Sequence, residues 1–148
     1  MVSGSWDGTA RVWSMADGAM VRVLEGHTSW VSSVCVTADG AHVVSGSDDK
    51  TARVWSMADG ALVRVLEGHT SYVSSVCVTA DGAYVVSGSD DRTARVWSMA
   101  DGAMVRVLEG HTGGVSSVCV TADGAHVVTA SYDRTARVWF LAMRLAGS

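Results

Sequence analysis

The fold is decided by residues 27–56, which read HTSWVSSVCVTADGAHVVSGSDDKTARVWS. This stretch is rich in valine, whose two Cβ branches suit a pleated strand better than a helix. Its short apolar segments alternate with Ala-Asp-Gly and Asp-Asp-Lys. Asp-Gly is a strong tight-turn signal, because glycine tolerates a positive φ. We therefore predict an antiparallel sheet of four short strands, at residues 31–37, 42–47, 51–57 and 61–66.

The same unit recurs with a period of 42 residues. The recurring positions include Trp13, Trp55, Trp97 and Trp139; His27, His69 and His111; and Cys35, Cys77 and Cys119. Residues 27–68 and 69–110 differ only at Trp30/Tyr72, His42/Tyr84, Lys50/Arg92 and Leu62/Met104. A period of ~40–45 residues with four strands per unit is typical of a propeller blade. Because a lone sheet of this size cannot cover both of its apolar faces, we expect each unit to stack on its neighbours.

Composition narrows the class of protein. The chain has 148 residues, 48% of them apolar and 26 of them valine, which argues against intrinsic disorder. A net charge of −4 argues against nucleic acid or an anionic membrane as the main partner. No apolar run approaches the ~18 residues of a membrane span, and the N-terminal residues lack the pattern of a signal peptide. We expect a cytoplasmic or nuclear protein that binds neither nucleic acid nor membrane.

The complete units contain, in order, Gly-His, a valine-rich strand, Ala-Asp-Gly, Val-Val-Ser-Gly-Ser, Asp-x-Thr and Ala-Arg-Val-Trp. This pattern resembles the WD40-repeat family over essentially the whole chain. Two features depart from it: Trp-Ser at residues 55–56 and its copies replaces Trp-Asp, and Thr-Ala-Asp-Gly replaces the usual Ser-Pro-Asp-Gly turn. The resemblance implies an all-β propeller of four-stranded blades. It also implies a non-enzymatic interaction scaffold that needs no cofactor and binds a protein or peptide on its top face.

The resemblance further implies a hydrogen-bonded tetrad of His, Ser or Thr, Asp and Trp in each blade. Such a network is physically reasonable, because a buried carboxylate and imidazole must be paired and an indole N–H needs an acceptor. By spacing, the tetrads are His27, Ser45, Asp49 and Trp55; His69, Ser87, Asp91 and Trp97; and His111, Thr129, Asp133 and Trp139. Ser3, Asp7 and Trp13 form a fourth set without a preceding His.

The blade boundaries give about three and a half repeats and an incomplete ring. We divide the chain into a partial blade lacking its first strand (1–26), two full blades (27–68 and 69–110), and a partial blade with a divergent tail (111–148). The chain is either a fragment of a larger WD40 protein or a homo-oligomer, for which we favour a dimer. A dimer has six blades if the terminal partial units merge, and eight if each counts as one. The apolar tail residues Phe140, Leu141, Met143 and Leu145 would suit a seam or replace the missing strand.

Catalytic and metal sites are disfavoured by the same repetition. Ser, His and Asp could form a hydrolase triad, but three copies at identical spacing do not fit the single reactive nucleophile of an active site. His27 and Cys35 are eight residues apart without the paired spacing of a zinc site. We expect each cysteine to be a small buried side chain. We therefore predict no catalytic, metal or cofactor residue.

The residues that vary between near-identical units are the candidates for binding. In propellers of this family such positions border the top face. The candidates are Trp6, Trp30, Asp48, Tyr72, Asp90 and Tyr132. Exposed Trp and Tyr are enriched in interface hot spots, so we predict that these residues bind a peptide or protein. Two alternatives stay open: neutral drift at loop tips, and a self-assembling propeller with no other partner.

Overall fold

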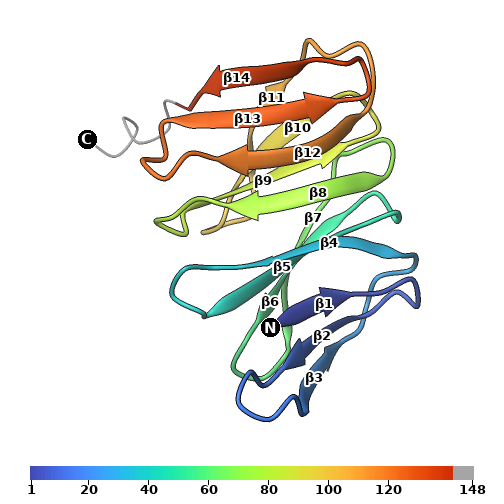
Figure 1. Ribbon diagram of the computed structural model, residues 1–148, viewed down its shortest axis with the longest axis vertical. Helices are drawn as coiled ribbons and strands as arrows, with labels where there is room; N and C mark the ends of the chain where they lie inside the picture. Colours follow the sequence, from blue (N-terminus) through green and yellow to red (C-terminus); the bar gives the residue numbers. More distant parts are fainter. Residues whose placement is uncertain (142–148) are drawn as a thin grey trace.

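The computed structural model describes residues 1–141, which form fourteen β-strands and no helix, in four antiparallel sheets (Figure 1). The first sheet comprises β1 (Val2–Gly4), β2 (Ala10–Trp13) and β3 (Met20–Leu24). The second comprises β4 (Val31–Val36), β5 (His42–Ser47), β6 (Ala52–Ser56) and β7 (Leu62–Leu66). The third comprises β8 (Val73–Val78), β9 (Tyr84–Ser89), β10 (Ala94–Ser98) and β11 (Met104–Leu108). The fourth comprises β12 (Val115–Val120), β13 (His126–Ser131) and β14 (Ala136–Phe140).

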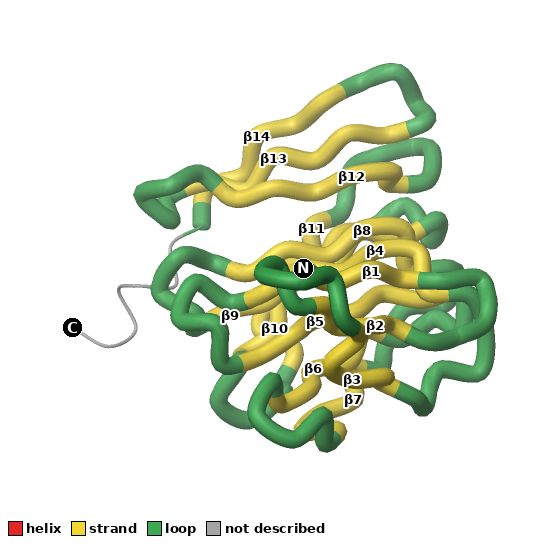
Figure 2. The backbone as a smooth tube through the Cα atoms, turned by 60° about the horizontal axis from the view of Figure 1, so that its bottom comes forward, coloured by secondary structure: helices red, strands yellow, loops and turns green. Residues whose placement is uncertain are grey.

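The sheets stack face to face in chain order, and strands that follow one another in the sequence pair within each sheet (Figure 1). Strand β4 contacts both β1 and β8, and β8 contacts β12, so the first strands of the full units lie along one inner edge. Figure 2 shows the loops gathered at the two ends of the strands. The first and fourth sheets lie at opposite ends of the stack, so the described residues form a partial propeller without a closed ring. This arrangement confirms the predicted all-β, propeller-type fold.

The core consists of three copies of one interface between consecutive sheets. At the second copy, the second sheet contributes Val44, Ala52, Val54 and Leu66. The third sheet contributes Val73, Val76, Val85 and Trp97. Burying a side chain of this size stabilises the fold by about 1.5–3 kcal/mol relative to leaving it exposed. A unit is therefore stable because its neighbour covers it.

Arginine side chains tie consecutive sheets together at their outer edge. Arg22 Nε donates to the carbonyl oxygen of Met57 at 3.0 Å, and Arg64 Nε donates to that of Met99 at 3.1 Å. Arg106 Nη1 reaches the carbonyl oxygen of Phe140 at 3.2 Å. Each arginine lies on the outermost strand of its sheet (β3, β7 or β11). Its partner lies at or just after the end of β6, β10 or β14 in the next sheet.

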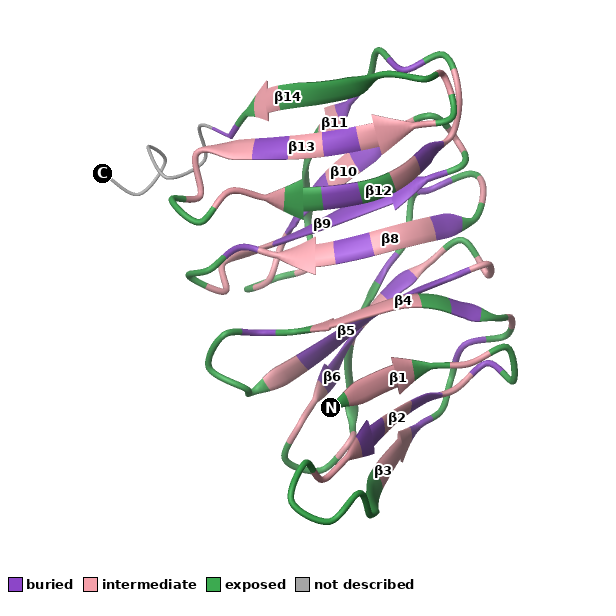
Figure 3. Cartoon of the chain, viewed as in Figure 1, coloured by how far each residue is buried: buried purple, intermediate pink, exposed green. Residues whose placement is uncertain are grey.

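The fourth sheet has an apolar face that no described residue covers (Figure 3). Val138 is 68% exposed, whereas the equivalent Val54 and Val96 are at most 1% exposed. The prediction of a buried cysteine is wrong for Cys119, which is exposed on this fourth sheet. Cys35 and Cys77 are half-buried and pack against the next sheet. Burial raises the pKa of the Cys35 and Cys77 thiols to about 12, which keeps both protonated.

The tail that begins at Phe140 is described only in part. Phe140 is 58% exposed and packs edge-on against His126, while Leu141 is buried in the last interface. Met143 and Leu145, which were predicted to contribute to a seam or a substitute strand, lie outside the described residues.

Close contact between sheets explains one change within the repeat. A Cβ atom at Gly88 would lie 2.8 Å from Cγ1 of both Val115 and Val118 in the next sheet, so only glycine fits there. Gly46 meets Val73 and Val76 in the same way. The equivalent position in the fourth sheet is Ala130, next to which the described residues place no further inner strand.

We predict that Gly88→Ala lowers the free energy of unfolding by about 1–3 kcal/mol, because the added methyl group overpacks the interface. The matched change Ala130→Gly should cost no more than about 1 kcal/mol, since it only loosens the backbone of a strand. Urea denaturation of both variants tests this difference. Equal effects of the two changes would contradict the account of the interface.

Candidate interaction face and its supporting network

One end of the stack carries the predicted binding residues and the histidines and aspartates of the tetrads, while the tetrad tryptophans lie further along the third strands. At this end lie the turns between the second and third strands, such as 47–51, and the loops that enter each full unit, such as 25–30. Asp48 N donates to the carbonyl oxygen of Trp30 at 2.9 Å, and Asp90 N donates to that of Tyr72 at 3.0 Å. These backbone bonds join each turn to the loop of the same unit, so variable residues of both segments lie together.

The structure brings together all four predicted tetrad residues of the second sheet. Nδ1 of His27 lies 2.8 Å from Oδ2 of Asp49, and Nε2 of His27 lies 2.7 Å from Oγ of Ser45. The indole N–H of Trp55 donates to the same Ser45 oxygen at 2.8 Å. His27, Ser45 and Trp55 are buried, so each of these polar groups has a partner in place of water.

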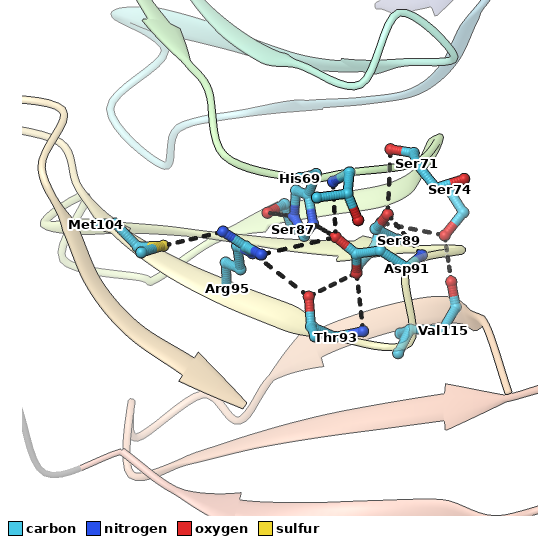
Figure 4. A network of polar contacts seen from close by, with 12 residues as sticks. His69, Ser71, Ser74, Ser87, Ser89, Asp91, Thr93, Arg95, Met104 and Val115 are labelled. Carbon is cyan, nitrogen blue, oxygen red and sulfur yellow. Dashed lines mark hydrogen bonds and ion pairs between the residues drawn. The ribbon is translucent and has the colours of Figure 1, made fainter. Parts of the chain in front are cut away.

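The third and fourth sheets repeat this geometry, and Figure 4 shows His69, Ser87 and Asp91 of the third. His69 lies 2.8 Å from Asp91 and 2.7 Å from Ser87, to which Trp97 also donates. In the fourth sheet His111 contacts Asp133 and Thr129 at 2.8 and 2.7 Å, and Trp139 donates to Thr129 at 2.9 Å.

In the first sheet the predicted set is only partly assembled. Trp13 donates to Ser3 at 2.9 Å, but Asp7 contacts Thr9 and Arg11 and neither Ser3 nor Trp13. The Asp7 side chain is 49% exposed, compared with 5% for Asp49. A tetrad carboxylate is therefore buried where a histidine covers it.

Each tetrad aspartate also ties its turn to the preceding loop. Oδ1 of Asp49 accepts hydrogen bonds from N and Oγ1 of Thr51 at 2.9 and 2.6 Å, and Oδ2 accepts one from N of Thr28. Arg53 lies 3.9 Å from the same Oδ2. One carboxylate thus fixes both segments that carry the variable residues.

Electrostatics determine the protonation of the network. Burial lowers the pKa of His27 more than the neighbouring Asp49 raises it, so the neutral imidazole is favoured. Burial alone would raise the pKa of Asp91, but hydrogen bonds from His69 and Thr93 outweigh it and the pKa lies well below its usual range. A neutral histidine with the proton on Nδ1 satisfies every bond: it donates to the carboxylate, and Nε2 accepts from the serine hydroxyl.

The network has the chemistry of a structural lock. The Ser45 and Ser87 side chains are fully buried and their hydroxyl oxygens already accept an indole N–H, so neither oxygen can reach a substrate. Among residues 1–141, no three His, Cys, Asp or Glu side chains are grouped so that they could hold a metal ion. The same part of the chain has no helix long and apolar enough to cross a membrane.

The six candidate binding residues, which we call the rim, lie on this end of the stack. Four of them are large aromatic side chains with exposed fractions of 77%, 50%, 50% and 72%: Trp6, Trp30, Tyr72 and Tyr132. Asp90 is exposed and Asp48 is half-buried. Burial, and then the nearby Asp90 carboxylate, raises the pKa of Asp48 above its usual value. The turn of one sheet therefore approaches the turn of the next.

Two features of the rim were not predicted from the sequence. Trp6 and Trp30 stack with ring centroids 4.9 Å apart and an interplanar angle of 18°. A shallow hollow beside this pair is lined by Asp7, Gly8, Thr28 and Ser29. The sequence does show a tryptophan in the turn of the first unit, Trp6, and another in the loop that enters the second, Trp30. Their contact could not be predicted, because it depends on how the two sheets are stacked.

The fold and the tetrads together define a WD-repeat propeller segment. The WD40 family, described as WD domain, G-beta repeat, matches residues 1–14, 18–56, 60–98 and 102–139. The chain therefore belongs to this family, whose members generally act as non-enzymatic scaffolds for protein interactions.

Two relatives match shorter parts of the chain. Nuclear distribution protein PAC1-2 of Uncinocarpus reesii is 50% identical over 40 residues, which are 27% of this chain and 9% of that protein. Small ribosomal subunit protein RACK1y of Oryza sativa subsp. japonica is 42% identical over 41 residues, 28% of this chain and 12% of that protein. The matches thus span only about a tenth of either relative.

We predict that the protein loses stability in acid. The lowered pKa of Asp91 contributes stability that is present above the unfolded value of about 3.9 and is lost as the pH falls toward the folded value. The lowered pKa of His27 acts in the same direction below about 6.5, because the folded state favours the neutral ring. The free energy of unfolding should therefore fall from pH 7 to pH 2.

Urea unfolding of the wild type and Asp91→Asn at pH 7, 5, 3 and 2 measures this dependence. The variant should be less stable at pH 7 and should show a flatter decline below pH 4, since it lacks one titrating carboxylate. Parallel curves for the two proteins would contradict the role of Asp91.

Proposed function

We propose that this chain is a non-enzymatic scaffold whose rim binds a segment of a partner protein, in the cytoplasm. The observation that carries the proposal is the exposure of four large aromatic side chains at one end of a repeat that is otherwise nearly invariant. Trp and Tyr supply much of the binding energy at interface hot spots. The Trp6–Trp30 stack is a preformed apolar anchor, because its two rings already support each other.

The supporting network makes the rim a rigid platform. Asp49 and Asp91 each bond a threonine of their own turn and a threonine of the preceding loop, so turn and loop keep their relative position. Because the platform is already ordered, its own loops lose little conformational entropy when a partner binds. Loop-tip drift, the alternative interpretation, gives no reason for Trp6 and Trp30 to stack across two sheets.

A second candidate function is self-association of the 148-residue polypeptide, with a dimer favoured. The face of the fourth sheet that carries Val138 is the same kind of surface that the first three sheets bury against their neighbours. Gly88 is closely approached by Val115 and Val118 of the inner strand β12. The methyl group of Ala130, at the equivalent position of the fourth sheet, would clash with valines placed in the same way. The first sheet lacks that inner strand, so its open face would fit beside Ala130. This fit favours four sheets from each of two chains over a six-bladed ring.

We predict that Trp30→Ala/Tyr72→Ala weakens binding of a captured partner by at least about tenfold, because two hot-spot side chains are lost. The unfolding free energy should change by less than about 1 kcal/mol, since both side chains are half-exposed. Affinity capture followed by titration with the purified partner measures both effects.

The control for this variant is Met15→Ala/Val21→Ala, which removes two apolar side chains outside the rim that are at least as exposed as Trp30 and Tyr72. It should bind like the wild type. If the control and the rim variant bind alike, the rim is not the docking surface.

We predict that native mass spectrometry of the isolated chain at micromolar concentration finds a dimer, and that Val138→Asp gives a monomer. The charge would be buried without a partner in the dimer, whereas the 68% exposed side chain tolerates it in the monomer. Val21→Asp, on an outer strand and 54% exposed, is the matched control. A wild-type monomer at every concentration would contradict self-association and leave the scaffold proposal intact.

A further inference from the structure

In the fourth sheet the aromatic rim residue lies in the turn and not at the entry to the inner strand. Units two and three place Trp30 and Tyr72 at the entry to the inner strand, but the fourth unit has Gly114 there. The aromatic side chain of the fourth unit comes instead from the turn, as Tyr132, where the two preceding units have Asp48 and Asp90. These exchanges bring an aspartate of one sheet next to an aromatic ring of the following sheet.

Gly114 is the point at which the two side chains meet. A Cβ atom on this glycine would lie 3.2 Å from Oδ1 of Asp90 and 3.3 Å from Cδ2 of Tyr132. A Cβ atom at position 114 would also lie 3.1 Å from Cα of Asp90 and would be crowded there, so the Asp90 carboxylate and the edge of the Tyr132 ring both lie directly against Gly114. The ring of Tyr132 is 72% exposed, so a face of it is open to a ligand.

The carboxylates at this place have no cation of their own. Within residues 1–141, neither Asp48 nor Asp90 forms an ion pair within 4 Å, although every tetrad aspartate contacts an arginine or a histidine. Burial, followed by the negative charge of the nearby Asp90, raises the pKa of Asp48. Lys50 and Arg92 lie in the same turns as Asp48 and Asp90, and Arg134 lies in the turn of Tyr132, but none of the three forms an ion pair within 4 Å among the described residues.

A guanidinium group matches this surface better than other common side chains. Its planar face stacks on an aromatic ring, and its N–H groups bond a carboxylate in two parallel hydrogen bonds. A cation beside Asp90 would also relieve the repulsion between the two aspartates. The carboxylates and the exposed ring therefore indicate a cationic, planar group on the partner, which the aromatic anchors alone do not.

We propose that an arginine side chain of the partner segment binds on the solvent side of Gly114, bonded to the exposed carboxylate of Asp90 and stacked on the exposed face of Tyr132, with Asp48 as a second carboxylate nearby. This inference rests on the proposed function, since it assumes that the rim is the docking surface. It adds the chemical class of the partner: a segment that carries an arginine and also an apolar side chain for the Trp6–Trp30 pair.

A random dodecamer peptide library selected on the full 148-residue chain tests this proposal. Peptides retained by the wild type and lost on Trp30→Ala/Tyr72→Ala define rim ligands, and each is resynthesised with citrulline in place of arginine. Citrulline keeps the shape of the side chain and removes its charge. We expect arginine in the rim ligands, and at least a tenfold loss of affinity with citrulline.

Matched variants of the protein complete the experiment. Asp90→Asn should weaken the arginine peptides about tenfold and leave the citrulline peptides unchanged, while Asp101→Asn, in a turn at the other end of the strands, should change neither. Rim ligands that bind equally well with citrulline would overturn the arginine site and leave the scaffold proposal standing. A selection that yields no rim-dependent peptide would overturn both.

Discussion

Apolar contact between consecutive sheets is the interaction on which the rest of this structure depends. The second sheet offers Val, Ala, Val and Leu to the third, which offers Val, Val, Val and Trp in return, and the other two interfaces use equivalent positions, some of them only partly buried. Hydrophobic burial of this kind is additive along a stack, and each unit interacts mainly with its nearest neighbours. Within residues 1–141, the second and third sheets are covered on both faces, whereas the first and fourth are covered on one. Differences between identical residues, such as Val96 and Val138, follow from this position in the stack.

The polar network at one end of the strands depends on that packing. The indole ring of Trp97 is part of the apolar interface, and its N–H group bonds Ser87, which in turn contacts His69. The network is thus attached to the core through the tryptophan and to the loops through the aspartate. The rim side chains take part in neither the tetrads nor the apolar interfaces. They can therefore vary between units while the strands and tetrads stay the same. A binding surface made of substitutions on a fixed repeat is the physical basis of the proposed scaffold.

The sequence predicts the repeat, the strands and the tetrad positions because each depends on residues within one 42-residue unit. Valine periodicity and Asp-Gly turns are local signals, and the spacing from His27 to Trp55 repeats in the next two units. Features that depend on the neighbouring sheet were missed. The exposure of Cys119, the stacking of Trp6 on Trp30 and the close approach of Asp90 to Tyr132 all involve contacts between units or the lack of them. The change from Gly88 to Ala130 was a visible signal of such a contact, but its meaning needs the positions of Val115 and Val118.

Amide hydrogen exchange of β9 and β13 tests the central claim most directly. Both strands are paired on two sides and contain the same valines, Val85 and Val86 in β9 and Val127 and Val128 in β13, and both hold a complete tetrad. They differ in that β9 is covered by a further sheet. If stability comes from the neighbouring sheet, the amides of β9 should exchange at least about tenfold more slowly than those of β13. Equal exchange rates would show that each unit is stable by itself, and would contradict the account.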